Sequence, residues 1–369
     1  MYRVFTPEIT KNDIASVTKT LKNNEISGTF GKEIIQLEKN FSNFVGTRYA
    51  STLSSGTTAL ELAVRCLNLP KNSEILISSN TNIATALACV KNKFKPVPVD
   101  SSLSTWNLDE NLLKKYLTKK TKAIIVVHFL GNPVDMKKIL QFSKKHNLKV
   151  IEDCAEAHGA VYDNKVVGSF GDIGCFSFYS NKVITSGEGG MITTNSLKIY
   201  KQINLLKNLS FSKIRFKHNL IGYNFRLSNI QCSLALSQLR RIKNTIKKKI
   251  RIAKNYEKYL DNNYLSFQHV NSKSKNIYWM YGIVLNKNVK KTKNRIIKEL
   301  LGKGIETRSF FYSMRNQPCL KKYFNLKSKK TPNSDFLWNN GIYLPSSHNL
   351  KEKDIFKISK IVNEVVSSR

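Results

Sequence analysis

Short apolar runs alternate with amphipathic stretches through the first half of the chain. Six runs rich in β-branched and other apolar residues have the length of β-strands and lie at residues 74–79, 95–100, 123–129, 149–154, 173–178 and 190–195. Stretches with apolar residues at helical spacing separate the first four runs, at residues 81–93, 108–118 and 134–146. Strands that alternate with helices are typical of βαβ units. The pattern therefore predicts a mostly parallel sheet covered by helices on both faces.

The pattern changes after about residue 228. It predicts a long helix, then a strand over residues 277–285, and then mixed helix and strand to the end. We therefore expect an α/β protein with a large domain over residues 1–245 and a smaller α+β domain over residues 246–369. A chain of 369 residues is long enough for two such cores. No run of 18 apolar residues occurs and the first residues lack the apolar segment of a signal peptide, so we expect no membrane association and a cytoplasmic location.

The strongly basic composition raises the possibility of a nucleic-acid partner. The chain has 61 Lys and Arg against 25 Asp and Glu, a formal net charge of +36. However, the lysines are spread along the whole chain. In the densest cluster, residues 240–258, Ile242, Ile246, Ile250 and Ala253 recur at helical spacing, which predicts an amphipathic helix with a solvated basic face. We therefore expect no nucleic acid, although a basic protein would attract anionic small molecules such as a nucleotide diphosphate.

The six cysteines are scattered and form no CxxC pair. Several lie inside apolar runs, which predicts buried thiols in a reducing compartment and no disulfides.

A serine- and threonine-rich turn precedes a predicted helix near residue 56. Gly56 lets the backbone turn closely, and the free amides of Gly56, Thr57 and Thr58 would point at an anion, with the hydroxyl groups of Ser55 and Thr57 beside them. The same residues are also an ordinary helix N-cap, so this pattern alone leaves both interpretations open.

Acidic residues follow the predicted strand that ends near residue 153. The stretch IEDCAEAHGA places Glu152 and Asp153 at the strand end, with Glu156 and His158 just after it. A carboxylate there could pair with a cationic ring nitrogen or a metal ion, or it could cap the next helix. No HxH, HxxxH or CxxC partner lies near His158, so we interpret it as a structural histidine and predict no metal site.

The third pattern surrounds Lys182, in FSFYSNKVITSGEGGMITTN at residues 176–195. A lysine held at the edge of an apolar site has a lowered pKa and can form an imine. The glycines at positions 187, 189 and 190 would let the backbone fold tightly around a bound group. Taken alone, a loop lysine is more often a surface lysine.

Together the three patterns describe an anion cradle, a carboxylate for a ring nitrogen and an imine-forming lysine. These are the groups that pyridoxal phosphate needs, because its ring acts as an electron sink when the ring nitrogen is protonated. The sequence therefore predicts pyridoxal 5′-phosphate as the cofactor, with Lys182 as the cofactor lysine.

The chain also resembles the DegT/DnrJ/EryC1/StrS family of sugar aminotransferases, and within it the perosamine synthases. The resemblance runs over nearly the whole chain. It is carried by SGTFGKEIIQLEKNF, IEDCAEAHGA, GSFGDIGCFSFYSNK, TSGEGGMITTN, GYNFRLSNIQCSLALSQL and GIYLPSSHNL, in this order. It implies the type I fold of aspartate aminotransferase, with a mostly parallel central sheet and a smaller α+β C-terminal domain, and a homodimer with shared active sites.

The resemblance also implies roles for individual residues. Lys182 would be the Schiff-base lysine, Asp153 would face the pyridine nitrogen, and Glu156 would lie near the ring hydroxyl. Phosphate would be bound by Ser55, Gly56, Thr57 and Ser177, and by Asn224 of the neighbouring subunit. Arg308 and Tyr312, in IETRSFFYSMR, would contact the sugar nucleotide.

The chain departs from the family pattern at three positions. Where most members have an aromatic residue that stacks on the cofactor ring, this chain has Asn82, which we still expect in the cofactor site. In the substrate loop, Ser313 replaces a proline and Arg315 a histidine. Lys182 argues against the dehydratase relatives, in which a histidine replaces the lysine.

The expected activity is transfer of the amino group of L-glutamate to C4 of a nucleotide-linked 4-keto-6-deoxy sugar, as in GDP-perosamine synthesis for a surface polysaccharide. One alternative is a 3-keto sugar aminotransferase of the same family. The other is a non-catalytic protein of this fold that binds nucleic acid or has a regulatory role. The nucleotide, whether GDP, dTDP or UDP, stays open, and GDP is favoured.

Overall fold

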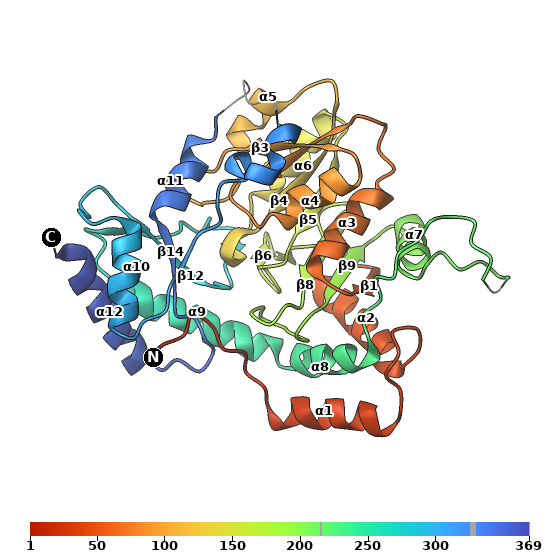
Figure 1. Cartoon of the computed structure of the whole chain (residues 1–369), viewed down its shortest axis with the longest axis horizontal. Helices are drawn as coiled ribbons and strands as arrows, with labels where there is room; N and C mark the ends of the chain where they lie inside the picture. Colours follow the sequence, from red (N-terminus) through yellow and green to blue (C-terminus); the bar gives the residue numbers. More distant parts are fainter. Residues whose placement is uncertain (215, 325–329, 369) are drawn as a thin grey trace.

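A seven-stranded sheet forms the centre of the protein in the computed structural model, which describes residues 1–214, 216–324 and 330–368 (Figure 1). Its strand order is β1-β9-β8-β5-β4-β2-β3. The strands are β1 (Tyr49–Leu53), β2 (Glu74–Ser78), β3 (Lys95–Val99), β4 (Thr121–Val127), β5 (Lys149–Asp153), β8 (Ile173–Ser177) and β9 (Gly190–Thr194). Strand β9 runs in the direction opposite to that of the other six strands. The predicted mostly parallel sheet is therefore confirmed.

Helices cover both faces of this sheet, which explains why its central strands are apolar on both faces. Alternate residues of β4 enter different apolar clusters: Ile124 and Val126 belong to one, and Ala123 and Ile125 to the other. The helices of this part are α1 (Lys11–Lys22), α2 (Lys32–Val45), α3 (Gly56–Cys66), α4 (Ala84–Lys91), α5 (Leu113–Tyr116), α6 (Met136–Lys145), α7 (Leu197–Lys207) and α8 (Asn229–Arg240). A strand buried on both faces reads as a continuous apolar run.

A smaller four-stranded sheet, β10-β12-β14-β13, follows in the last third of the chain (Figure 1). Its elements are α9 (Ile242–Tyr259), β10 (Leu265–Ser266), β12 (Tyr281–Leu285), α10 (Lys293–Gly302), β13 (Arg308–Ser309), α11 (Pro332–Asn340), β14 (Gly341–Leu344) and α12 (Glu352–Ser367). Short strands β6 (Val161–Tyr162), β7 (Lys165–Val166) and β11 (Ser274–Lys275) make a third sheet that joins the two parts. The two larger sheets lie on either side of residue 245, but α9 runs through that position, so the domain boundary stays a prediction.

Three expectations need correction. The strand expected from residue 277 begins only at Tyr281, because Tyr278 has a left-handed backbone (φ 50°) and the residues before β12 form a loop. Strand β1 was not expected as a strand at all. Among the cysteines, Cys319 is exposed rather than buried.

The basic helix α9 is amphipathic as expected. Ile242 and Ile246 are buried and Ile250 is partly buried. One of its lysines is not solvated: Lys249 is buried and donates to the carbonyl oxygen of Ser346 at 2.6 Å. In the described part of the chain, no helix has the length and apolar character needed to cross a membrane.

We predict that Gly190→Ala destabilises the protein, because a Cβ atom there would lie 2.3 Å from the carbonyl oxygen of Ser55. Overpacking of this kind costs roughly 1–3 kcal/mol in free energy of unfolding. Urea denaturation monitored by circular dichroism measures the loss. Gly302→Ala is the matched control, since a Cβ there meets nothing within 4 Å. It should be neutral or slightly stabilising, and equal stability of the two variants would contradict the predicted clash.

Candidate active site

A cavity of about 400 Å³ lies where the carboxyl ends of β4, β5 and β8 meet the start of α3. Eight of the eleven residues predicted for the site line it: Ser55, Gly56, Thr57, Asn82, Asp153, Glu156, Ser177 and Lys182. The carboxyl ends of parallel strands are where open α/β sheets bind ligands.

The start of α3 forms one end of the cavity. Ser55 caps the helix: its hydroxyl oxygen accepts from the Thr58 amide at 3.1 Å, and its own amide donates to Thr58 Oγ1 at 3.0 Å. The Thr58 amide is therefore not free for an anion, contrary to expectation. The amides of Gly56 and Thr57 bond to no other group in the described chain, so they remain available at the positive end of the helix.

Gly56 also lies directly against Ser177. A Cβ atom at position 56 would come within 2.7 Å of Ser177 Cβ. The close approach brings the hydroxyl group of Ser177, at the end of β8, beside the start of α3. The two predicted phosphate-binding segments therefore meet at one point.

Asp153 is the last residue of β5 and its carboxylate is buried at the cavity wall. Thr85 Oγ1 donates to Asp153 Oδ2 at 3.0 Å, and the Ala155 amide donates to Oδ1 at 3.1 Å. Burial raises the pKa of the Asp153 carboxyl group, while these hydrogen bonds and the charge of Lys182 partly oppose the shift. A buried carboxylate is costly without a cationic partner. A protonated ring nitrogen facing Asp153 would offset that cost.

Glu156 and Lys182 complete the charged part of the cavity. The Leu130 amide donates to Glu156 Oε2 at 2.9 Å. Burial raises the pKa of Glu156 to about 7, against the pull of the Lys182 charge. Lys182 keeps some exposure because it opens onto the cavity, but protein crowds its amine on the other sides. This burial lowers the pKa of Lys182, and Glu156 and Asp153 partly oppose the change.

Trp279 is a cavity residue that sequence reasoning missed. The Lys182 Nζ atom lies 3.8 Å from the centroid of its ring, and its indole Nε1–H donates to the Asn181 carbonyl oxygen at 2.7 Å. The residue was hidden in the stretch expected to be a strand. Thr85, which fixes Asp153, was also missed. The one indication in the sequence was its position three residues after Asn82, a spacing that predicts that the two side chains lie on the same face of a helix.

Asn82 supplies no ring to the cavity. Its side-chain oxygen accepts from the Ala84 amide at 3.0 Å, at the start of α4. The apolar walls are formed instead by Val127, Ala155, Trp279 and Phe311.

Three predicted residues lie outside the residues that line this cavity. Asn224 is exposed on the segment between α7 and α8, where it pairs with Asn208. Arg308, in β13, is exposed beside Glu306 at 3.4 Å. Tyr312 is 38% exposed and packs edge-on against Trp338.

His158 lies behind the cavity and is buried against Phe176 and Phe178. Burial lowers its pKa to about 3, and the Lys182 charge acts in the same direction. The ring is therefore neutral at physiological pH.

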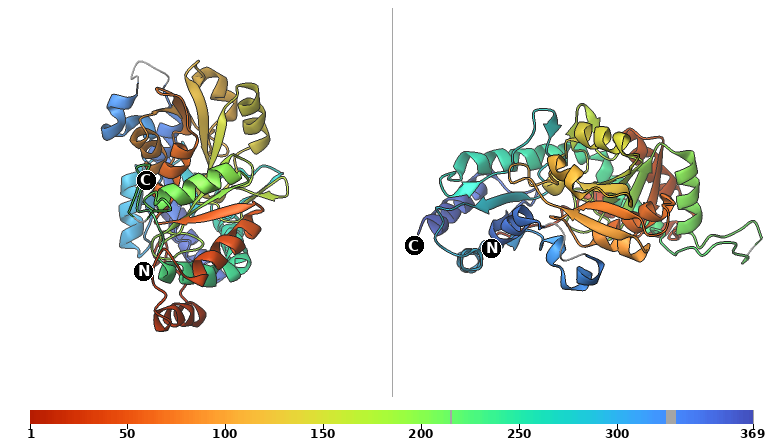
Figure 2. Two further views of the ribbon diagram at one scale, coloured as in Figure 1. Left: turned by 90° about the vertical axis from the view of Figure 1, so that its right-hand side faces the viewer. Right: turned by 90° about the horizontal axis from the view of Figure 1, so that it is seen from above.

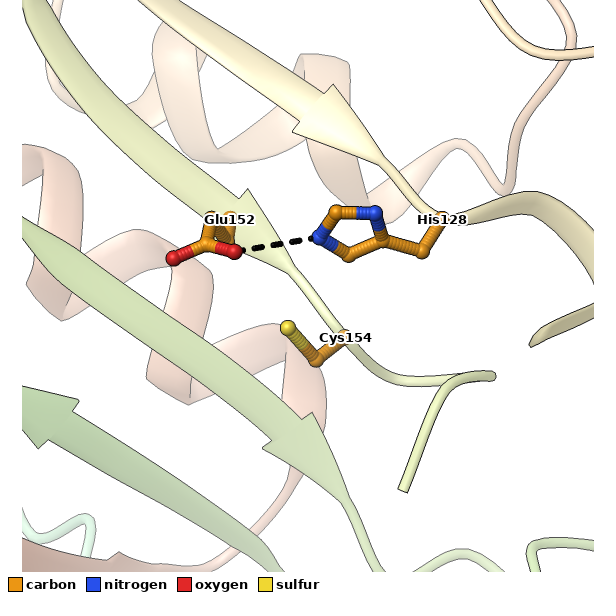
Figure 3. Close-up of side chains that lie close together, drawn as sticks. All are labelled: His128, Glu152 and Cys154. Carbon is orange, nitrogen blue, oxygen red and sulfur yellow. Dashed lines mark hydrogen bonds and ion pairs between the residues drawn. The ribbon is translucent and has the colours of Figure 1, made fainter. Parts of the chain in front are cut away.

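In the described residues, one cluster has metal-type ligands close together: His128, Glu152 and Cys154 (Figure 3). Their ligand atoms lie within 4.8 Å of one another and all three are buried. The Val134 amide donates to His128 Nδ1, which leaves Nε2–H to donate to Glu152 Oε2 at 3.2 Å.

The other acceptor positions of Glu152 are also taken. Its carboxylate accepts from the amides of Gly168, Phe170 and Gly171 at 2.7–2.8 Å. We interpret the cluster as a support that ties β4, β5 and the turn before β8 together, and the absence of a metal site stays a prediction.

The cavity fits pyridoxal phosphate in its donor set. Free helix amides with the Ser177 hydroxyl match a phosphate group, and buried Asp153 matches a cationic ring nitrogen. An amine with a lowered pKa matches an aldehyde. The Gly56–Ser177 contact leaves no room for a side chain where the phosphate would approach the backbone.

Comparisons with known proteins agree with this geometry. The model of the DegT/DnrJ/EryC1/StrS aminotransferase family matches residues 7–363. A GDP-perosamine synthase from Escherichia coli O157:H7 is 36% identical over 370 residues, covering 99% of each chain. A dTDP-3-amino-3,6-dideoxy-alpha-D-galactopyranose transaminase from Aneurinibacillus thermoaerophilus is 30% identical over 90% of each chain. The solved structure of Helicobacter pylori PseC, an aminotransferase of pseudaminic acid biosynthesis, superposes with a TM-score of 0.93 at 27% identity over 99% of each chain.

The chain therefore belongs to the DegT/DnrJ/EryC1/StrS aminotransferase family. It is a sugar aminotransferase of the type I fold, and pyridoxal phosphate is its cofactor. Its enzymatic class sets aside the alternative of a non-catalytic binding protein.

We predict that Glu156 makes the stability of the cofactor-free protein depend on pH. Its folded-state pKa, about 7, lies above the usual 4.5, so the folded protein holds this proton more tightly than the unfolded chain does. The stabilisation is complete below pH 4.5 and is lost as pH rises through 7. Relative to Glu156→Gln, the wild type should lose up to about 3 kcal/mol of unfolding free energy between pH 4.5 and 8.

Urea denaturation of both proteins at several pH values measures this difference. Glu188→Gln, at an exposed position on the rim of the same cavity, is the control and should follow the wild type. Parallel pH profiles for wild type and Glu156→Gln would show that Glu156 is not the titrating group.

Proposed function

We propose that this enzyme transfers the amino group of L-glutamate to C4 of a GDP-linked 4-keto-6-deoxy sugar, in the synthesis of a surface polysaccharide such as an O-antigen. The observation that carries the proposal is the single cavity in which the start of α3, Asp153 and Lys182 meet. The similarity to a GDP-perosamine synthase along the whole chain supports the choice of sugar nucleotide.

Each charged residue of the cavity has a role in this proposal. The bound cofactor supplies an aldehyde that carries the amino group and a ring that withdraws electrons. The start of α3 and Ser177 would hold its phosphate, and Asp153 its ring nitrogen. Glu156 would hold the ring hydroxyl. The Nζ atom of Lys182 would hold the aldehyde carbon and, once released, would take a proton from the substrate carbon and return it.

The nucleotide would lie outside the cavity, toward Arg308 and Tyr312. Phe311 lines the cavity, and the next residue, Tyr312, is exposed. A substrate whose sugar enters the cavity would therefore leave its diphosphate on this side. The exposed Arg308 guanidinium is suited to bind a diphosphate, because its planar donors match phosphate oxygens.

Amination at C3 is the second candidate. The relative from Aneurinibacillus is named for a 3-amino product on a dTDP sugar, and it covers nine-tenths of the chain. The site residues that hold the cofactor do not distinguish the two positions, because they face the cofactor and not the sugar.

We propose further that two copies of the chain share their active sites. The segment between α7 and α8 extends away from the body of the protein (Figures 1 and 2). It carries exposed apolar side chains, among them Ile221, which is 91% exposed, and Leu220. A second copy would bury them. Asn224 lies on the same segment and outside its own cavity, so it would reach the phosphate of the partner's cofactor.

The activity is tested with cofactor-loaded enzyme, L-glutamate and a panel of keto sugars carrying GDP, dTDP or UDP. We expect the GDP-linked 4-keto-6-deoxy sugar to be converted fastest, to a 4-amino product identified by mass spectrometry and NMR. Lys182→Ala should show no turnover, and borohydride should no longer attach the cofactor at this site, because the lysine amine that lines the cavity is gone.

Asp153→Asn is the matched control for cofactor loading. It should keep borohydride attachment but lose most activity, since a neutral amide cannot hold the ring proton. Faster conversion of a 3-keto substrate would show that amination occurs at C3 and not at C4. Turnover by Lys182→Ala would refute the proposed lysine.

Mixed dimers test the shared site. Asn224→Ala should weaken cofactor binding by roughly 1.5–3 kcal/mol, the value of a hydrogen bond to a charged group. At limiting cofactor it should be nearly inactive, as should Lys182→Ala. If the two variants are refolded together, about half of the dimers are mixed and one site in each has both residues intact. Roughly a quarter of wild-type activity should return.

If Asn224 serves its own chain, every site carries a defect and mixing restores nothing. The absence of recovery would therefore contradict the shared site, once mixed dimers have been detected by native mass spectrometry.

A further inference from the structure

Trp279 reaches the cavity from the smaller sheet, just before β12. Its side chain is 4% exposed, and one face of the indole lies under the Lys182 amine at 3.8 Å. Within the described part of the chain, the Lys182 amine forms no hydrogen bond with a side chain or a carbonyl group. The ring therefore lies in direct contact with this nitrogen.

Two hydrogen bonds, one from the indole and one from the backbone of Trp279, fix the position of the ring. Its indole Nε1–H donates to the carbonyl oxygen of Asn181, the residue before Lys182, at 2.7 Å. Its backbone amide donates to the Leu130 carbonyl oxygen at 2.9 Å. The Leu130 amide in turn donates to Glu156 Oε2 at 2.9 Å. These bonds form a chain from Glu156 to the lysine loop, and the ring lies inside it.

A π face holds an ammonium group differently from a carboxylate. The attraction is electrostatic and is strongest for Trp, but it uses no directed hydrogen bond. An amine resting on a ring can therefore move away without breaking a hydrogen bond. This arrangement also keeps the carboxylates of Asp153 and Glu156 free to bind the ring of the cofactor.

We propose that Trp279 is a positioning residue that holds the Lys182 amine in a resting place while the amine is released from the cofactor and carries a proton. The inference rests on the proposed role of Lys182. In each catalytic cycle the amine is released once and must bond again. A fixed ring would keep it within reach of the same carbon atom and away from the two carboxylates.

The alternative is that Trp279 only fills the core. Its ring does pack edge-on against Tyr343, at 6.2 Å between centroids. A purely structural role predicts sensitivity to the size of the side chain. The proposed role predicts sensitivity to the electron density of the ring face at constant size, and fluorination separates the two.

The test places tryptophan analogues with increasing numbers of ring fluorines at position 279 by stop-codon suppression. Fluorine withdraws electrons from the ring face with little change in shape. The pKa of Lys182 is then measured in the cofactor-free protein by competitive acetylation at several pH values, with peptide mass spectrometry as the readout. Correct folding is checked by circular dichroism.

We expect the Lys182 pKa to fall stepwise with each fluorine. The full series should lower it by about one unit, a tenfold change in the ratio of charged to neutral amine at a given pH. Lys293 provides an internal control, because its amine lies 3.9 Å from the ring of Trp338, which is not replaced. Its pKa should not move.

A Lys182 pKa that stays constant across the series, or rises, would overturn the proposal. Borohydride attachment of the cofactor to Lys182 is measured on the same proteins. If attachment fails in the wild type, the proposed function is wrong. If attachment succeeds while the pKa does not respond to fluorine, only the role of Trp279 is wrong.

Discussion

Burial of three ionisable groups in one cavity is the constraint on which the active site depends. Asp153, Glu156 and Lys182 all lie where water is scarce, and burial pushes the pKa values of the two acids up and that of the amine down. Each group is therefore less stable in its charged form than it would be in water. A bound cofactor would offset both costs of burial, because its cationic ring nitrogen would pair with a carboxylate and its aldehyde would bond to the amine.

The large sheet keeps this arrangement in place through the alternation of β5. Successive residues of a strand point to opposite faces, so Asp153 faces the cavity while Glu152 faces away. Glu152 is held by His128 and by three amides of the turn before β8. The strand end that carries Asp153 is thus fixed from behind, and the turn that leads into β8 is fixed with it.

The smaller sheet contributes to the cavity through a loop. The stretch from residue 277 reads as a strand because it is apolar and aromatic. Tyr278 takes a left-handed backbone there, and the amides of Ile277 and Trp279 bond to the carbonyl oxygens of Gly131 and Leu130. Hydrogen bonds between residues so far apart in the chain cannot be predicted from the local sequence pattern. At Asn82 the sequence did show that no aromatic ring stands at that position, and the bond that its side chain accepts from the Ala84 amide is local.

Local pattern and chemistry by themselves determined the class of sheet, the cofactor and the position of Lys182 at the end of an apolar run. Those features depend on alternation, helix starts and residue types, all of which are read within a few residues. The tertiary structure alone decided that Trp279 lies under the lysine, that Thr85 orients Asp153 and that Glu152 braces the strand behind it. Each of these contacts joins residues far apart in the chain, so it depends on how the sheets and loops pack.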